Sequence, residues 1–226
     1  MVTVPTACKY DYEYWMFQLA REKSVDCCLV ASEWFKEYYK TKLEPEFYNK
    51  VIPWASGVKL VKNKNSGPTM SCICYYKKLP VNSSLNELLD KFGIKYYNLE
   101  YAKHNFIDWT ELLKQVDFVI FCQDYVETQG LAIAEAWAYN KPTFIKLNTN
   151  EYGGKTSPYL TDKQGLFYND IEELQKILLS YKENPKDFLS KFSPAEYIEK
   201  NMSDAVSVKN LIEIFDNKDN DCKIKI

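Results

Sequence analysis

Two carboxylates bracket the part of this chain whose residue types are best suited to chemistry. Glu127 and Glu135 stand at the two ends of the string ETQGLAIAE, which follows one apolar run and precedes another. Glu127 lies in a predicted loop, where its carboxylate could accept hydrogen bonds from sugar hydroxyls. Glu135 lies about two turns into a predicted helix. Two carboxylates at this spacing could bind the two ends of one extended, hydroxyl-rich ligand.

The turn between these glutamates, formed by Thr128, Gln129, Gly130 and Leu131, is the predicted start of that helix. The first amides of a helix have no intrahelical partner and carry a partial positive charge, so they favour an anion such as a phosphate. Gly130 has no side chain and would let a ligand approach the backbone closely. The segment therefore has the features expected of a site for a sugar linked to a diphosphate.

The elements that must position this segment alternate along the chain between strand-like and helical patterns. Such alternation is typical of a parallel sheet covered by helices on both faces. We therefore predict the α/β class with a Rossmann-like parallel sheet flanked by helices. Ligands of open α/β sheets bind beyond the carboxyl ends of the strands, which is where residues 127–131 would lie. The predicted strands are 25–31, 70–76, 94–99, 116–122, 143–147 and 166–168, and the predicted helices include 33–39, 85–92 and 130–139.

Helix starts can be assigned from side chains that cap free amides. Ser32 is the candidate for the first helix, Ser84 with Glu87 for the second, Asp108 with Glu111 for a helix that reaches Gln115, Asp170 with Glu173 for a later one, and Ser193 before Pro194 for the last.

Composition bears on the partners of this chain and on its cellular compartment. The 226 residues carry a net charge of -2 with no block of like charges, so a nucleic acid is not an expected partner. Arg21 is the sole arginine, which leaves lysine as the side chain that would hold a phosphate. Seven cysteines without a C-x-x-C pair indicate a reduced compartment, and neither a signal peptide nor a membrane span is apparent. We expect a cytoplasmic protein.

The string from Glu127 to Pro142 resembles the E-x7-E motif of retaining GT-B glycosyltransferases, in particular the donor-binding half of the family 4-like enzymes. By this resemblance Glu127 is the catalytic residue that contacts the donor sugar. The turn from Thr128 through Gln129 and Gly130 to Leu131 binds the sugar and diphosphate, and Glu135 binds the ribose. Lys77 and Lys78 fall where the family places basic residues that meet the diphosphate. The matched positions are the two glutamates, Gly130, Leu131, Ala136, Ala138 and Pro142.

Two positions depart from that motif, since Gln129 stands where many members have an aromatic residue and Asn140 where many have glycine. The resemblance also implies a division of the chain. Residues 1–55 would be a short βα segment left from an acceptor half, 56–216 the nucleotide-sugar-binding domain, and 217–226 a frayed polar tail. The string 52–58 resembles the crossing between the two halves. The chain thus resembles half of a GT-B unit.

The stretch from Thr156-Ser-Pro-Tyr159 through Gly165 is similar to half-sized transferase domains of large DNA viruses of algae and amoebae, among them chlorovirus rhamnosyltransferases. This resemblance would make UDP-rhamnose a candidate donor and the host cytoplasm the location.

The function expected from these observations is transfer of a hexose from a UDP- or GDP-sugar to a glycan hydroxyl. By the resemblance to GT-B enzymes, which usually need no metal for chemistry, no metal or other cofactor is expected. The string Asp219-Asn-Asp221 matches the D-x-D of metal-dependent GT-A enzymes, but it lies in the polar tail and not after a strand. Adjoining domains of a longer polypeptide, or a second copy of the chain, would complete the acceptor site. The alternative is a non-catalytic nucleotide-sugar- or glycan-binding module of a larger transferase. A GT-B epimerase is a weaker alternative, since its catalysis needs groups from both halves.

Overall fold

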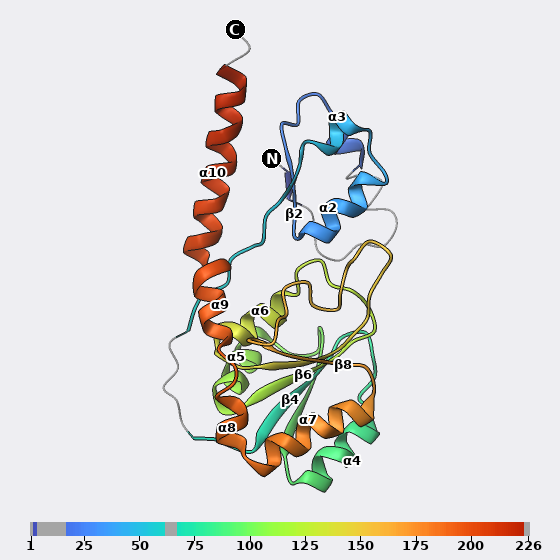
Figure 1. The fold of residues 1–226 in the computed structure, drawn as a ribbon, viewed down its shortest axis with the longest axis vertical. Helices are drawn as coiled ribbons and strands as arrows, with labels where there is room; N and C mark the ends of the chain where they lie inside the picture. The colour runs from blue at the N-terminus through green and yellow to red at the C-terminus, as the bar shows by residue number, and fades with distance from the viewer. Residues whose placement is uncertain (1, 4–16, 62–66, 224–226) are drawn as a thin grey trace.

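The computed structural model describes residues 2–3, 17–61 and 67–223, which form two parallel β-sheets and their covering helices (Figure 1). The smaller sheet has the order β1-β2-β3, with β1 (Val2–Thr3), β2 (Cys28–Val30) and β3 (Val51–Pro53). The larger sheet has the order β5-β4-β6-β7-β8, with β4 (Ser71–Tyr76), β5 (Lys95–Glu100), β6 (Phe118–Cys122), β7 (Thr143–Lys146) and β8 (Gly165–Tyr168). The predicted α/β class is confirmed.

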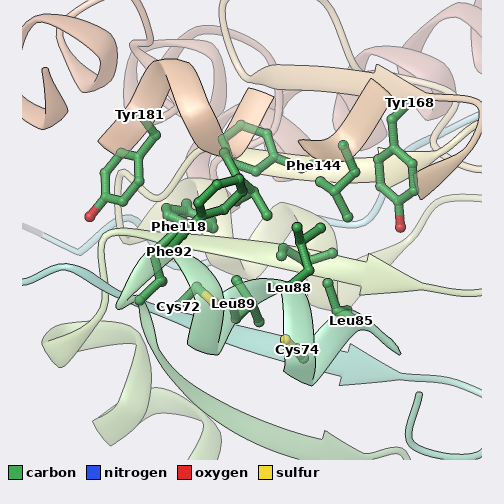
Figure 2. Packing of buried hydrophobic residues seen from close by; sticks show 14 of the residues in the cluster. Cys72, Cys74, Leu85, Leu88, Leu89, Phe92, Phe118, Phe144, Tyr168 and Tyr181 are labelled. Atoms are coloured by element: carbon green, nitrogen blue, oxygen red, sulfur yellow. The ribbon is translucent and has the colours of Figure 1, made fainter. Parts of the chain in front are cut away.

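Helices cover both faces of the larger sheet because alternate side chains of its central strands point to opposite faces. From β4, Cys72, Cys74 and Tyr76 pack with α4 (Ser83–Phe92), α7 (Ile171–Glu183) and α8 (Pro185–Leu189), and Figure 2 shows part of this cluster. Ile73 and Tyr75 point the other way, toward α5 (Phe106–Gln115), α6 (Leu131–Ala138) and α9 (Pro194–Asn201). All six side chains of β4 are buried, as expected for a doubly covered strand.

The order of the strands in the larger sheet reverses direction at β4. The chain runs from β4 outward to β5, then returns to place β6 on the opposite side of β4 and continues to β7 and β8. Loops that follow β4 and β6 therefore leave the sheet in opposite directions, and the crevice between them is where ligands of open α/β sheets bind. The chain segments that follow β4 and β6 contain Lys77, Lys78 and Glu127.

The N-terminal part of the chain forms its own small layer, in which α2 (Glu33–Lys40) and α3 (Pro45–Tyr48) pack beside β2 and β3 (Figure 1). Residues 51–53 form β3 and pair with β2, so the predicted crossing segment, 52–58, begins inside this sheet. The crossing then contacts the last helix, α10 (Asp204–Lys223). Trp54 Nε1 donates to the carbonyl of Ser207 at 2.9 Å, and Ser207 Oγ donates to the carbonyl of Ala55 at 2.8 Å.

Two helix caps differ from those predicted. Asn82, not Ser84 with Glu87, caps α4 by accepting from the amides of Ser84 and Leu85, and Asn105 caps α5 by accepting from the amide of Asp108 at 2.8 Å. Asparagine is as good a cap as serine or aspartate, and the real helices begin slightly earlier than the patterns indicated.

The predicted starts of α2, α7 and α9 agree with the structure in position, but of their predicted capping side chains only Asp170 makes its hydrogen bond. Ser32 precedes α2 but makes no capping hydrogen bond with its side chain. The Asp170 cap of α7 is confirmed, since its carboxylate accepts from the amide of Glu173 at 2.8 Å. Pro194 is the first residue of α9, as predicted.

The C-terminal segment predicted to fray from Asn217 is helical as far as Lys223, as the continuation of α10. None of the helices in the described parts of the chain combines the length and the apolar character needed to cross a lipid bilayer.

We expect Gly165→Ala to destabilise the larger sheet severely. Gly165 pairs with Thr143 across β7 and β8, and a Cβ atom on Gly165 would lie 1.9 Å from the Thr143 carbonyl oxygen. The strands would have to separate, at a cost of about 3 kcal/mol or more. This should lower Tm by about 6 °C or more in a thermal melt. Gly67→Ala is the control, since no atom lies within 4 Å of its added Cβ; equal melting of both variants would contradict the assigned packing.

Candidate functional site

Three chain segments meet at the carboxyl edge of β5, β4 and β6, and each brings one polar or aromatic side chain. Tyr101 follows β5, Lys77 follows β4 and Glu127 lies in the loop after β6. The ladder extends into these segments, because the amide of Lys77 donates to Cys122 at 3.2 Å and that of Tyr101 to Tyr76 at 2.8 Å. The backbone positions of Lys77 and Tyr101 are therefore fixed by the sheet itself.

Lys77 and Glu127 form an ion pair that is shielded from water. Lys77 Nζ lies 2.6 Å from Glu127 Oε1, and the two side chains are only 22% and 7% exposed. An ion pair removed from water in this way adds little to stability, since desolvation offsets much of the attraction. Its place at the carboxyl edge of the sheet, where the strand order reverses, makes it a candidate for function. The structure thus brings together two of the residues that the sequence singled out.

Lys78 lies beside the same pair and is exposed. Its φ of 63° is in the left-handed region, which residues other than glycine adopt rarely and mostly at sites where the chain must turn sharply. Its ammonium group lies 4.7 Å from the centre of the Tyr125 ring. Tyr125 was not among the residues predicted from sequence. Its position, two residues before Glu127 in the loop after β6, is the signal that could have identified it.

The backbone around Glu127 is held by contacts to the rest of the chain. Its amide donates to Lys155 at 3.2 Å, and its carbonyl accepts from Trp34 Nε1, in α2, at 2.9 Å. The oxygen Thr128 Oγ1 is buried and has no hydrogen-bond partner within the described chain. The loop that carries the candidate catalytic carboxylate is therefore in contact with the N-terminal layer.

Gln129 has a structural role that its sequence position did not reveal. Its side-chain amide forms two hydrogen bonds with the backbone of Ser56, accepting from the amide at 3.1 Å and donating to the carbonyl at 2.7 Å. Gln129 is 3% exposed, so its side chain is not accessible to a ligand. The residue that replaces the family's aromatic side chain thus attaches the crossing segment to the start of α6.

Gly130 and Leu131 form the start of α6, as predicted. Gly130 is the N-cap residue with φ 78°, in the left-handed region, and a Cβ atom there would lie 3.1 Å from Ile133 Cδ1. Leu131 is the first helical residue and is 39% exposed. The first amides of a helix lack intrahelical partners and carry a partial positive charge, so an anion would be attracted to this end of α6.

Glu135 lies in a second cluster, which includes Tyr75. Trp109 Nε1 donates to Glu135 Oε2 at 2.9 Å. The ring of His104 lies against Tyr75, with 5.4 Å between the ring centres, and His104 Nδ1 is 2.8 Å from the carbonyl of Glu100. Burial raises the pKa of the Glu135 carboxyl, although the Trp109 hydrogen bond and the charge of His104 act in the opposite direction. Burial and the charges of Glu135 and Glu127 raise the pKa of Tyr75, so this side chain lies near both carboxylates.

Asn140 stands where the E-x7-E motif has glycine, and its backbone conformation is one that glycine also adopts. Its φ is 56°, in the left-handed region that glycine and asparagine tolerate best. Its side-chain oxygen also accepts from the amide of Ala195 at 3.2 Å. The substitution therefore preserves the backbone turn after α6.

No group of three or more histidine, cysteine, aspartate or glutamate side chains gathers for a metal ion within the described residues. The side chains of Asp219-Asn-Asp221 lie outside that part of the chain. Independence from metals stays a prediction.

Comparison with known proteins finds similar structures but no similar sequence. No family model matches the chain, and no curated protein sequence matches it either. A point mutant of S. aureus TarM, solved with Fondaparinux, alpha-GlcNAc-glycerol and UDP, superposes with a TM-score of 0.67 at 15% identity, covering 92% of this chain and 47% of TarM. HepE of Anabaena, solved with UDP and glucose, superposes with a TM-score of 0.64 at 11% identity, covering 93% of this chain and 68% of HepE.

A glycosyltransferase from Rickettsia africae superposes with a TM-score of 0.59 at 13% identity, covering 95% of this chain and 68% of that protein. At these identities the likenesses show the fold alone, and it is the fold of GT-B proteins. The chain spans about half the length of TarM.

We expect Glu135→Gln to stabilise the protein at neutral pH but not in acid. Because the folded-state pKa of Glu135 is raised, folding favours its protonated form, and its charge lowers stability above that pKa. Glutamine keeps the shape and can still accept from Trp109. Tm should therefore rise by about 2–4 °C at about pH 7, and the gain should vanish near about pH 4, where the wild-type carboxyl is protonated. Glu87→Gln, on an exposed position of α4, should show no such pH-dependent gain. A gain at both pH values would contradict the electrostatic origin.

Proposed function

We propose that this chain is a GT-B glycosyltransferase that binds a nucleoside diphosphate sugar at the carboxyl ends of β4 and β6 and transfers the sugar to a glycan hydroxyl. The observation that carries the proposal is the shielded Lys77 and Glu127 pair, which lies beside the start of α6 at the strand-order reversal. A phosphate-binding helix start, cations and a carboxylate are the groups that a phosphate-linked sugar needs.

The positive groups would act on the leaving group. In the transfer, the bond from the sugar carbon to the diphosphate oxygen breaks and a bond to the acceptor oxygen forms, while the proton of the acceptor hydroxyl passes to the departing diphosphate. Negative charge grows on the departing diphosphate, where Lys77, Lys78 and the first amides of α6 would stabilise it. These groups already supply positive charge, so we propose that the reaction needs no metal ion.

Glu127 and Glu135 would bind the two ends of the donor, as in the E-x7-E arrangement. Glu127 would accept hydrogen bonds from the sugar hydroxyls and orient the sugar for transfer. Glu135, already oriented by Trp109, would accept from the ribose hydroxyls. The same resemblance supports retention of configuration at the sugar carbon.

UDP-sugars are the first donors to test, since the TarM mutant and HepE were both solved with UDP. The resemblance of residues 156–165 to half-sized viral transferase domains adds UDP-rhamnose to that set and supports a place in the host cytoplasm. We also propose that an acceptor-binding half comes from adjoining domains or from a second copy of the chain. The short N-terminal sheet and the 47% coverage of TarM support this proposal.

A binding screen tests the proposed function directly. In buffer with a metal chelator, UDP- or GDP-sugars should raise Tm, and the stabilising sugar should release UDP or GDP when glycan acceptors are added. Stabilisation without release would favour a binding module or a missing acceptor half. No shift with any nucleotide would contradict the proposed donor site.

We expect Glu127→Ala to abolish transfer without weakening nucleotide binding. Loss of the carboxylate removes the group that orients the sugar, so kcat should fall by about 100-fold or more. The same change frees the ammonium of Lys77 from its partner, so the affinity for UDP should be unchanged or higher. Kinetics and calorimetry measure the two effects separately. Glu151→Ala, on an exposed loop residue, is the control, and wild-type turnover by Glu127→Ala would remove the central claim.

A further inference from the structure

We infer that Tyr125 is a positioning residue whose ring holds the ammonium groups of Lys77 and Lys78 at the diphosphate end of the site. The inference rests on the proposed function for the identity of the ligand. The role of Tyr125 itself is inferred from the position of its ring relative to the two lysines.

The Tyr125 ring is shared by two cations. Lys77 Nζ lies 5.4 Å and Lys78 Nζ 4.7 Å from its centre, both within the range in which an ammonium is attracted to an aromatic face. Consecutive residues of an extended chain point their side chains in opposite directions. The left-handed φ of 63° at Lys78 is the turn that brings both lysines to the same ring.

The two lysines differ in what else they contact. Lys77 is paired with Glu127 and also lies 5.2 Å from the centre of the Tyr101 ring. Lys78 contacts the Tyr125 ring and lies at the solvent-exposed side. The carboxylate of Asp124, next to Tyr125 in sequence, is paired with Lys146 at 2.9 Å. The Tyr125 ring is therefore the contact that orients Lys78.

The ring of Tyr125, rather than its hydroxyl, carries this role. The hydroxyl oxygen is buried and lies close to the carboxylate of Glu127. Burial, reinforced by the negative charge of Glu127 and by the hydrogen bond between the two side chains, raises the pKa of Tyr125, so the phenol stays neutral beside the diphosphate. The ammonium groups lie over the ring, which phenylalanine also has. Phenylalanine at position 125 should therefore preserve the positions of both lysines.

Positioning matters because free lysine side chains are flexible. Ordering a long side chain on ligand binding costs affinity, and a ring that has already ordered two ammonium groups reduces that cost. The two lysines and Glu127 leave one net positive charge at this edge, which matches the sign needed for a diphosphate.

The test measures binding of UDP, inorganic pyrophosphate and uridine to the full chain by calorimetry. Tyr125→Leu should weaken UDP and pyrophosphate about tenfold, equivalent to about 1.4 kcal/mol, and leave uridine unchanged. Tyr125→Phe should bind all three within about twofold of wild type. Tyr101→Leu is the matched control, because it removes a ring from Lys77 alone and should weaken pyrophosphate by about threefold or less.

A second series of variants at position 125 tests the inference even if Tyr125→Leu does not fold. Phenylalanine analogues with increasing fluorination at position 125 keep the size of the ring but reduce the negative charge on its face. Affinity for pyrophosphate should fall stepwise along the series while Tm stays constant. Pyrophosphate affinity that is flat along this series, or UDP affinity unchanged in Tyr125→Leu, overturns the inference alone. Wild-type binding of pyrophosphate but not UDP overturns the proposed donor while leaving the inference supported by the series. Binding of neither ligand by the wild type overturns both.

Discussion

The reversal of strand order at β4 is the constraint on which the rest of the site depends. A strand covered by helices on both faces can present polar chemistry only at its ends. In this sheet the loops after β4 and β6 leave in opposite directions, at the position where ligands of open α/β sheets bind. The lysines follow the first of these strands and the carboxylate follows the second, so the ion pair of Lys77 and Glu127 forms at that position.

The site contains features that a chain selected for stability alone would avoid. Lys78 adopts a left-handed conformation, the carboxylate of Glu127 is almost fully shielded, and burial raises the pKa of Glu135. Such costs are typical of places where groups are held ready for a ligand. Their concentration along one edge of one sheet is an argument for function that is independent of the resemblance in the motif.

The N-terminal layer and the crossing segment form hydrogen bonds with the residues around the candidate site. Trp34 donates to the carbonyl of Glu127, Gln129 bonds to the backbone of Ser56, and Tyr159 OH donates to the carbonyl of Ala31 at 2.5 Å. A movement of this layer would therefore be transmitted to the loop that carries Glu127.

The sequence by itself determined the class of the fold and the succession of strands and helices, and it supplied the hypothesis that residues 127–135 bind a donor. These follow from local rules: apolar periodicity, a glycine before a helix, and the register of one motif. Only the tertiary structure decided that Lys77 pairs with Glu127, that Tyr125 lies against both lysines, and that the Gln129 side chain bonds to Ser56. Those contacts join segments brought together by strand order, and the order of parallel strands is set by how helices pack over the whole sheet, which no local pattern encodes.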